Sequence, residues 1–129
     1  MAVEPPVEFL DLDDLIDLAR RLVGDPPPIR DVGLLASAVA RPQTTVGAED
    51  AYPTTWLKAA ALLQSVVGNH ALVDGNKRLG WLSVAVFLEI NDVSVAAASN
   101  DDVYTLVMQV AKAELALDDI AERLRRLVD

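Results

Sequence analysis

The chain has 129 residues, enough to bury a core without metal or disulfide cross-links, and we expect one domain over residues 1–129. It contains no cysteine, which excludes disulfides and thiolate metal sites and makes a reducing cytoplasm the expected location. Its formal charge of -9 argues against a direct nucleic-acid surface, because neutralising phosphates requires clustered Lys and Arg.

The amino-terminal segment, MAVEPPVEFLDLDD, carries acids where a signal peptide would place bases, so we expect mature sequence. No run approaches the roughly 18 uncharged residues of a membrane span, which predicts a soluble protein. Helical periodicity begins at Phe9, with Asp11 as a candidate N-cap, and Gly24 with the following prolines should end this helix. Its apolar positions are Leu12, Leu15, Ile16, Ala19, Leu22 and Val23.

Two further helices are predicted before the middle of the chain. Asp31 is expected to cap a short one that Pro42 ends, and a loop of about a dozen residues follows, long enough to be functional. The next helix starts near Thr54 and runs out at Gly68 and Asn69. Their apolar positions are Leu34, Leu35, Ala38 and Val39 in the first, and Trp56, Ala59, Ala60, Leu63, Val66 and Val67 in the second.

The segment after Gly75, NKRLGWLSVAVFLEI, is apolar nearly all round, which predicts a central helix buried by its neighbours and ending at Asn91. Ser99 or Asp101 should open another helix, and Asp118 a last one. The short VSVAAA could be extended, but no segment offers it a partner strand. The apolar positions are Val103, Leu106, Val107 and Val110, then Ile120, Leu124, Leu127 and Val128. The predicted fold is all-α, a compact bundle of about six helices.

Polar residues concentrate in one stretch, NHALVDGNKRLGW at 69–81. His70 should close one helix and Gly75 open the next, whose bare N–H groups and dipole attract anions. Lys77 and Arg78 add cations in the first turn, where the dipole disfavours them unless something negative lies nearby. Asp74 is placed to bind Mg²⁺ together with phosphate oxygens, and His70 to act as a general base. Together these groups suit phosphoryl or nucleotidyl transfer.

Each of these residues also has an ordinary structural interpretation. A histidine at a helix end is more often a cap than a catalyst, Asp-Gly-Asn is common turn chemistry, and a Lys-Arg pair often lies on a solvated face. Those interpretations do not explain why the polar groups converge at the entrance of the most apolar helix. A P-loop is excluded because its motif is missing, and the usual zinc sites because there is one His and no Cys.

The stretch from His70 to Arg78, HALVDGNKR, closely resembles the signature of the Fic/Doc superfamily, H-x-F-x-[D/E]-G-N-[G/K]-R, which lies on a helical fold. Its Asn-Lys-Arg ending is similar to the Doc ("death on curing") branch, small bacterial toxins encoded with an antitoxin. SAVARPQ at 37–43 and FLEINDVSV at 87–95 resemble further segments of the family. Leu72 replaces the usual Phe, a core anchor, which changes shape rather than chemistry.

The resemblance implies a role for each motif residue. His70 would deprotonate a hydroxyl of a protein substrate, and Asp74 would help to hold Mg²⁺. Gly75 and Asn76, with the neighbouring backbone amides, would bind phosphate of ATP. Lys77 and Arg78 would bind and polarise the nucleotide.

The resemblance also implies a reaction, with alternatives. Most Fic enzymes transfer AMP and have glycine where this chain has Lys77, and a second arginine where it has Trp81. Doc toxins bind the nucleotide in the opposite sense and transfer the γ-phosphate to a threonine of elongation factor Tu. We therefore predict an ATP-dependent protein Ser/Thr kinase that arrests translation. Gly75, where Doc itself has alanine, leaves AMP transfer open, and a helical binding module without activity is the third hypothesis.

The Doc resemblance further implies partners. A Phd-like antitoxin, with a disordered tail that folds as it docks in a groove, would restrain the toxin in the bacterial cytoplasm and carry the DNA binding. The loop at 44–53, TTVGAEDAYP, lies where the family has a flap that aligns the substrate backbone. An ordinary surface loop is the alternative for this segment.

Overall fold

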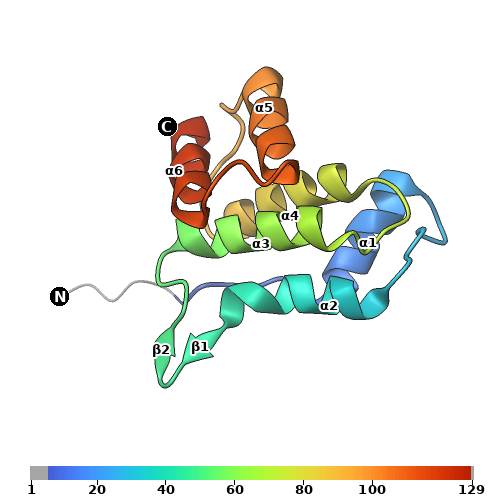
Figure 1. Cartoon of the computed structure of the whole chain (residues 1–129), viewed down its shortest axis with the longest axis horizontal. Helices are drawn as coiled ribbons and strands as arrows, with labels where there is room; N and C mark the ends of the chain where they lie inside the picture. Colours follow the sequence, from blue (N-terminus) through green and yellow to red (C-terminus); the bar gives the residue numbers. More distant parts are fainter. Residues whose placement is uncertain (1–5, 129) are drawn as a thin grey trace.

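The computed structural model of the protein describes residues 6–128, so the expectation of a mature amino terminus rests partly on residues outside the description. In this part of the chain, six α-helices surround one buried core (Figure 1). The elements are α1 (Leu12–Val23), α2 (Val32–Ala40), the 3-10 helix η1 (Arg41–Gln43), β1 (Thr45–Val46), β2 (Glu49–Asp50), α3 (Thr55–Asn69), α4 (Asn76–Ile90), α5 (Asn100–Ala111) and α6 (Leu117–Val128). The predicted all-α bundle of about six helices is confirmed. None of the described helices is long and apolar enough to cross a bilayer.

Side-chain caps set where four helices begin. Asp11 and Asp14 form a reciprocal capping box at the start of α1, as the Asp11 cap predicted. Asp31 and Thr54 cap α2 and α3 with one bond each, accepting from the N–H of Leu34 and of Leu57. Ser99, whose backbone is extended, caps α5 by accepting a hydrogen bond from the N–H of Asp102. Of the two predicted caps for α5, Ser99 is therefore correct, because Asp101 is already helical. The last helix starts earlier than predicted, at Leu117, and Asp118 lies within its first turn.

Helix α3 lies at the centre of the bundle and packs against α2, α4, α5, α6 and η1. Its buried residues are Lys58, Ala59, Ala60, Ala61, Leu62, Leu63, Ser65, Val66 and Val67. The helix predicted to be buried, α4, packs against α1, α3 and α5 and buries Leu79, Gly80, Ser83, Val84, Phe87 and Leu88. Its Trp81 and Leu82 are half-buried beside a pocket. The sequence did not single out α3, which has still more helices around it.

Helices α3 and α4 run side by side and approach closely at Gly80 (Figure 1). A Cβ atom at Gly80 would lie 2.6 Å from Cγ2 of Val67, a contact that real structures do not show. This close approach couples the end of one helix to the start of the next. The short connection between them, residues 70–75, is therefore held between two packed helices.

Residues 44–53, predicted as a loop, contain a small antiparallel hairpin in which Thr45 pairs with Asp50 and Val46 with Glu49. Gly47, with φ of 65°, makes the turn that connects the two strands. The hairpin lies beside the beginning of α3, whereas the motif follows the end of α3 (Figure 1). The VSVAAA segment forms no strand, consistent with its lack of a partner.

Two basic side chains hold this hairpin against α3. The Arg41 guanidinium donates to the Tyr52 hydroxyl at 2.9 Å, to Gln64 Oε1 at 2.7 Å and to Ser65 Oγ at 3.0 Å, and lies 5.2 Å from the centre of the Tyr52 ring. Lys58, only 3% exposed, forms an ion pair with Asp50 at 3.1 Å. It also donates to the Tyr52 carbonyl. The cations of Arg41 and Lys58 are thus paired with groups of the chain itself.

Candidate active site

His70 ends α3 through its backbone, which adopts the left-handed conformation with φ 52° and ψ 46°. The interpretation of His70 as a helix cap is therefore correct for the main chain. Its imidazole is a separate matter, because the side chain is exposed and has no hydrogen-bond or ion-pair partner among residues 6–128. The cap therefore uses only the backbone of His70, and the imidazole ring can take part in a reaction.

The loop after His70 is fixed by hydrogen bonds to the segment between α1 and α2. The N–H groups of Arg30 and Asp31 donate to the Ala71 carbonyl at 2.8 and 3.1 Å, and the N–H of Val73 donates to the Pro28 carbonyl at 2.8 Å. The Arg30 guanidinium donates to the His70 carbonyl. These contacts join segments about 40 residues apart and place His70 on a rigid support.

Leu72 anchors the loop in the core, where it is 1% exposed. This burial agrees with the anchoring role expected of the residue that replaces the motif's Phe. The Asn76 side chain then closes the loop, because its Nδ2 donates to the Leu72 carbonyl at 3.0 Å and its Oδ1 accepts from the Leu72 N–H at 2.9 Å. Asn76 was predicted to bind phosphate, and its role in closing the loop was not predicted, because no local pattern reveals it.

Gly75 begins α4 in a conformation that favours glycine, with φ of 92°. A Cβ atom there would also lie 2.9 Å from Cγ2 of Val23 on α1, so the position is both left-handed and crowded. The Gly75 N–H donates to Asp74 Oδ1 at 2.8 Å. This bond orients the Asp74 carboxylate, whose second oxygen remains exposed to solvent with the rest of the side chain.

The first turn of α4 combines several groups that attract anions. The N–H groups of residues 76–78 have no acceptor in the part of the chain that the structure describes, and the turn contains no acidic residue. Lys77 and Arg78 are exposed, and neither forms an ion pair or hydrogen bond with another described residue. A positive site thus lies on a chain with a formal charge of -9.

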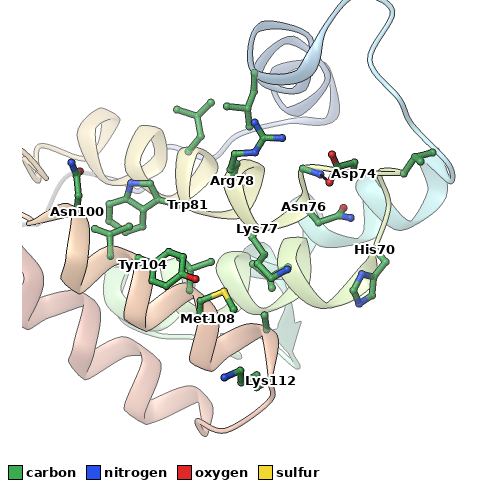
Figure 2. Close-up of a pocket in the computed structure, with 18 residues that line it drawn as sticks. His70, Asp74, Asn76, Lys77, Arg78, Trp81, Asn100, Tyr104, Met108 and Lys112 are labelled. Carbon is green, nitrogen blue, oxygen red and sulfur yellow. Dashed lines mark hydrogen bonds between the residues drawn. The ribbon is translucent and has the colours of Figure 1, made fainter.

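All six predicted site residues line one pocket of about 970 Å³ between α4 and α5 (Figure 2). They are His70, Asp74, Gly75, Asn76, Lys77 and Arg78. The opposite wall, which α5 and its C-cap form with Asn100, Tyr104, Met108 and Lys112, was not predicted from the sequence. The signal was available in part, because these residues recur at every fourth position and so share one face of the helix.

Comparison with known proteins also points to the loop at 70–78, because this loop lies within the part of the chain that matches a known family. The model of the Fic/DOC family matches residues 9–88, which include the whole of His70 to Arg78. The chain belongs to the Fic/Doc family. It is also similar to "Toxin Doc" of Mycolicibacterium smegmatis (strain ATCC 700084 / mc(2)155), with 49% identity over 118 residues that cover 91% of each chain.

The donor set of this Fic/Doc chain fits a metal ion that arrives with a nucleotide. Within residues 6–128 no group of three or more His, Asp or Glu side chains could enclose an ion, and the loop offers the single carboxylate of Asp74. Magnesium commonly takes one or two protein carboxylates and completes its shell with phosphate oxygens and water. Asp74 is therefore suited to hold Mg²⁺ that is shared with a polyphosphate.

The hairpin at 44–53 does not line this pocket. It lies at the other end of α3, which at the usual helical rise is about 22 Å long. A role for the hairpin in positioning a substrate therefore stays a prediction from the resemblance to the Fic/Doc family.

Proposed function

We propose that this protein is a Doc-type toxin that transfers the γ-phosphate of ATP to a Ser or Thr hydroxyl of a translation factor, elongation factor Tu by resemblance. The observation that carries the proposal is the unpartnered His70 imidazole in the same pocket as free N–H donors and two unpaired cations. The 49% identity to a protein named Toxin Doc supports the toxin part of the proposal.

His70 acts as the general base in the proposed reaction. Its imidazole accepts the proton of the substrate hydroxyl while the hydroxyl oxygen forms a bond to the γ-phosphorus. The bond between the γ-phosphorus and the β,γ-bridging oxygen breaks, and ADP leaves with the electron pair. The exposure of the ring suits this role, because a protein substrate must reach the base from solvent.

The start of α4 binds the transferred phosphoryl group. The N–H groups of residues 76–78 donate to its oxygens, and Lys77 and Arg78 offset the charge that develops as the bridging bond breaks. Asn76 keeps one Nδ2 hydrogen for this purpose and otherwise preserves the shape of the loop. Magnesium, when bound at Asp74, supplies further neutralisation of the polyphosphate.

Two residues favour γ-phosphate transfer over AMP transfer. Lys77 occupies the position of the glycine that AMP-transferring Fic enzymes carry, and Trp81 occupies the position of their second arginine. Both changes alter how a triphosphate lies across the loop. Gly75 agrees with the wider superfamily rather than with Doc and favours the alternative, AMP transfer.

The proposed toxin is restrained by a Phd-like antitoxin. Its disordered tail folds on this chain, as expected for a segment that wraps a preformed groove. DNA binding then belongs to the antitoxin, because this chain is acidic. Growth arrest on expression of the chain, relieved by co-expression of a neighbouring antitoxin gene, is the expected cellular result.

The test of the reaction compares two labels. The purified protein is incubated with Mg²⁺ and elongation factor Tu, once with ATP labelled in the γ-phosphate and once with ATP labelled in the α-phosphate. Label from the γ-position alone is the expected result, and mass spectrometry of the product then locates one added phosphoryl group. Label from the α-position would establish AMP transfer instead.

The control variant is His70→Asn. Asparagine tolerates the left-handed backbone of this position better than alanine, so the substitution removes the base with little strain. The expected rate is lower by a factor of about 10²–10⁴, the usual contribution of a general base. Unlabelled product with the wild-type protein, from either ATP, would leave the helical binding module as the function.

A further inference from the structure

We propose that Arg30 is a positioning residue for His70, the general base of the proposed reaction. Its guanidinium holds the main chain of His70 in the conformation that directs the imidazole into the pocket. This inference rests on the proposed function, because it assumes that His70 accepts a proton from the substrate. It gives a task to a side chain outside the motif and outside the lining of the pocket.

The His70 imidazole has no neighbour that orients it directly. A histidine that acts as a base is commonly held by a third group, which bonds to its second ring nitrogen. The imidazole of His70 is exposed and forms no hydrogen bond or ion pair with any residue of the described range 6–128. The direction of the ring therefore depends on the backbone from which it projects, at one end of the pocket (Figure 2).

The backbone of His70 adopts a conformation that needs support from its surroundings. Its φ of 52° and ψ of 46° lie in the left-handed region, which is unfavourable for a residue with a Cβ atom. Such a conformation persists where neighbouring contacts hold it. Because α3 ends at Asn69, the His70 carbonyl also lacks the N–H group that a continuing helix would supply.

Arg30 holds two consecutive carbonyl groups at this point. Its guanidinium donates to the His70 carbonyl, and its own N–H donates to the Ala71 carbonyl at 2.8 Å. No other residue in the part of the chain that the structure describes donates to the His70 carbonyl. The angle ψ of His70 sets the direction of that carbonyl, so a rotation out of the left-handed region would break its bond to the guanidinium.

The main chain of Arg30 is itself fixed, although its side chain is exposed. The next residue, Asp31, caps α2 with its side chain and donates its N–H to the Ala71 carbonyl at 3.1 Å. The guanidinium therefore reaches the His70 carbonyl from a rigid starting point, and only the side chain has to be ordered. A cation at the C-terminal end of α3 also interacts favourably with the helix dipole.

The first measurement is an NMR experiment that needs neither nucleotide nor substrate. His70 is the only histidine of the chain, so its ring gives a single set of signals, and its Cα and Cβ chemical shifts report φ and ψ. Arg30→Ala is expected to move the ring signals and to shift Cα and Cβ away from left-handed values. Arg30→Lys, which keeps a cationic donor, should resemble the wild type. Arg21→Ala removes an exposed arginine of α1 outside the pocket and should change neither. Unchanged His70 signals in Arg30→Ala would overturn the proposal.

The second measurement follows transfer of label from γ-labelled ATP. Arg30→Ala is expected to lower kcat by a factor of about 10–100, because a small misplacement of a reacting group can cost this much. The KM for ATP should not change, since Arg30 does not line the pocket. Arg30→Lys should recover most of the rate. A higher KM at unchanged kcat would contradict the proposal, because Arg30 would then bind a substrate directly.

A double variant separates positioning of the base from other roles of Arg30. In the His70→Asn background, Arg30→Ala should not lower the remaining rate further, because no base is left to position. An equal loss in both backgrounds would overturn the proposal, since Arg30 would then act on the substrate or on the fold. If the wild type transfers no label while the His70 signals respond to Arg30→Ala as expected, the proposed function is wrong and the control of the His70 conformation by Arg30 is right.

Discussion

The hairpin end and the motif end of the bundle both carry basic side chains, but the chain treats them in opposite ways. At the hairpin end, Arg41 and Lys58 form hydrogen bonds and an ion pair that hold the segment at 44–53 against α3. After the end of α3, Lys77 and Arg78 are exposed and have no partner among residues 6–128. Both ends are rich in polar groups, but the cations are paired at the first end and unpaired at the second.

This difference separates structural charges from functional ones. A buried cation needs internal partners to offset the loss of hydration, so Lys58 at 3% exposure is paired. Two adjacent cations at a helix N-terminus are opposed by the dipole, and no carboxylate of the described residues forms an ion pair with either of them. An anionic ligand would remove the unfavourable interaction, so in the proposed function the second end is the binding end.

The largest expected effect is on activity at the binding end. Arg78→Ala should lower the rate of phosphoryl transfer by a factor of about 10²–10³, typical for loss of one group that stabilises developing charge. The melting temperature should hardly change, because the side chain has no partner to lose. Arg21→Ala, at an exposed position of α1 outside the pocket, is the matched control. A fall in stability without a fall in rate would reverse the assignment of the two ends.

The next effect is on stability at the structural end. Arg41→Ala should lower the free energy of unfolding by about 2–3 kcal/mol, because Gln64 and Ser65 lose a charged hydrogen-bond donor. Urea denaturation measures this loss as a lower midpoint at constant slope. The folded fraction should keep its activity. A larger loss of activity than of stability would instead give the hairpin a part in substrate binding, as the family flap predicts.

Substitution of Asn76 should lower both the transfer rate and the stability, because Asn76 belongs to the binding end and also closes its loop. Asn76→Ala removes two hydrogen bonds and leaves the N–H and carbonyl of Leu72 without partners. The expected loss is about 2 kcal/mol of unfolding free energy, with a slower transfer reaction. Thermal unfolding and the labelled-ATP assay check the two parts. Loss of activity at unchanged stability would show that Asn76 serves the phosphate alone.

A smaller effect is expected at Gly75. Gly75→Ala forces a side chain into the left-handed region and against Val23, at a cost of about 1–2 kcal/mol. Differential scanning calorimetry measures this cost. Gly68→Ala is the control, because a Cβ atom there meets nothing within 4 Å. Equal stability of the wild type and Gly75→Ala would indicate that the loop relaxes to fit the methyl group.

The smallest effect concerns an ion pair on the surface, outside both ends. The hydrogen bond from Arg125 to Glu122 holds the pKa of Glu122 below its ordinary value of 4.5. A lowered pKa contributes stability that is present above the ordinary pKa and is lost as the pH falls through the lowered one. Glu122→Gln should therefore lower the melting temperature slightly at neutral pH and not in strong acid. A large shift would show that exposed charges matter more here than expected.

Much of the fold follows from local signals in the sequence. Helical periodicity and the caps Asp11 and Asp31 predicted where α1 and α2 begin, and periodicity placed the start of α3 near Thr54, because these signals depend on neighbouring residues. The motif predicted that His70, Asp74, Gly75, Asn76, Lys77 and Arg78 lie together, because a single tight loop holds them near one another whatever surrounds it. Short-range geometry therefore decided both the helices and the grouping of the motif residues at one end of the pocket.

Only the tertiary structure decided what the remaining groups do. The contacts of Arg41 with Gln64, of Arg30 with the loop carbonyl of His70, and of α5 with the pocket join residues far apart in the sequence. No local pattern distinguishes the paired Lys58 from the unpaired Lys77, because pairing depends on which segments pack together. The sequence by itself determined which polar and charged groups the chain contains. Packing determined which of these groups are paired within the fold and which remain free to bind a ligand.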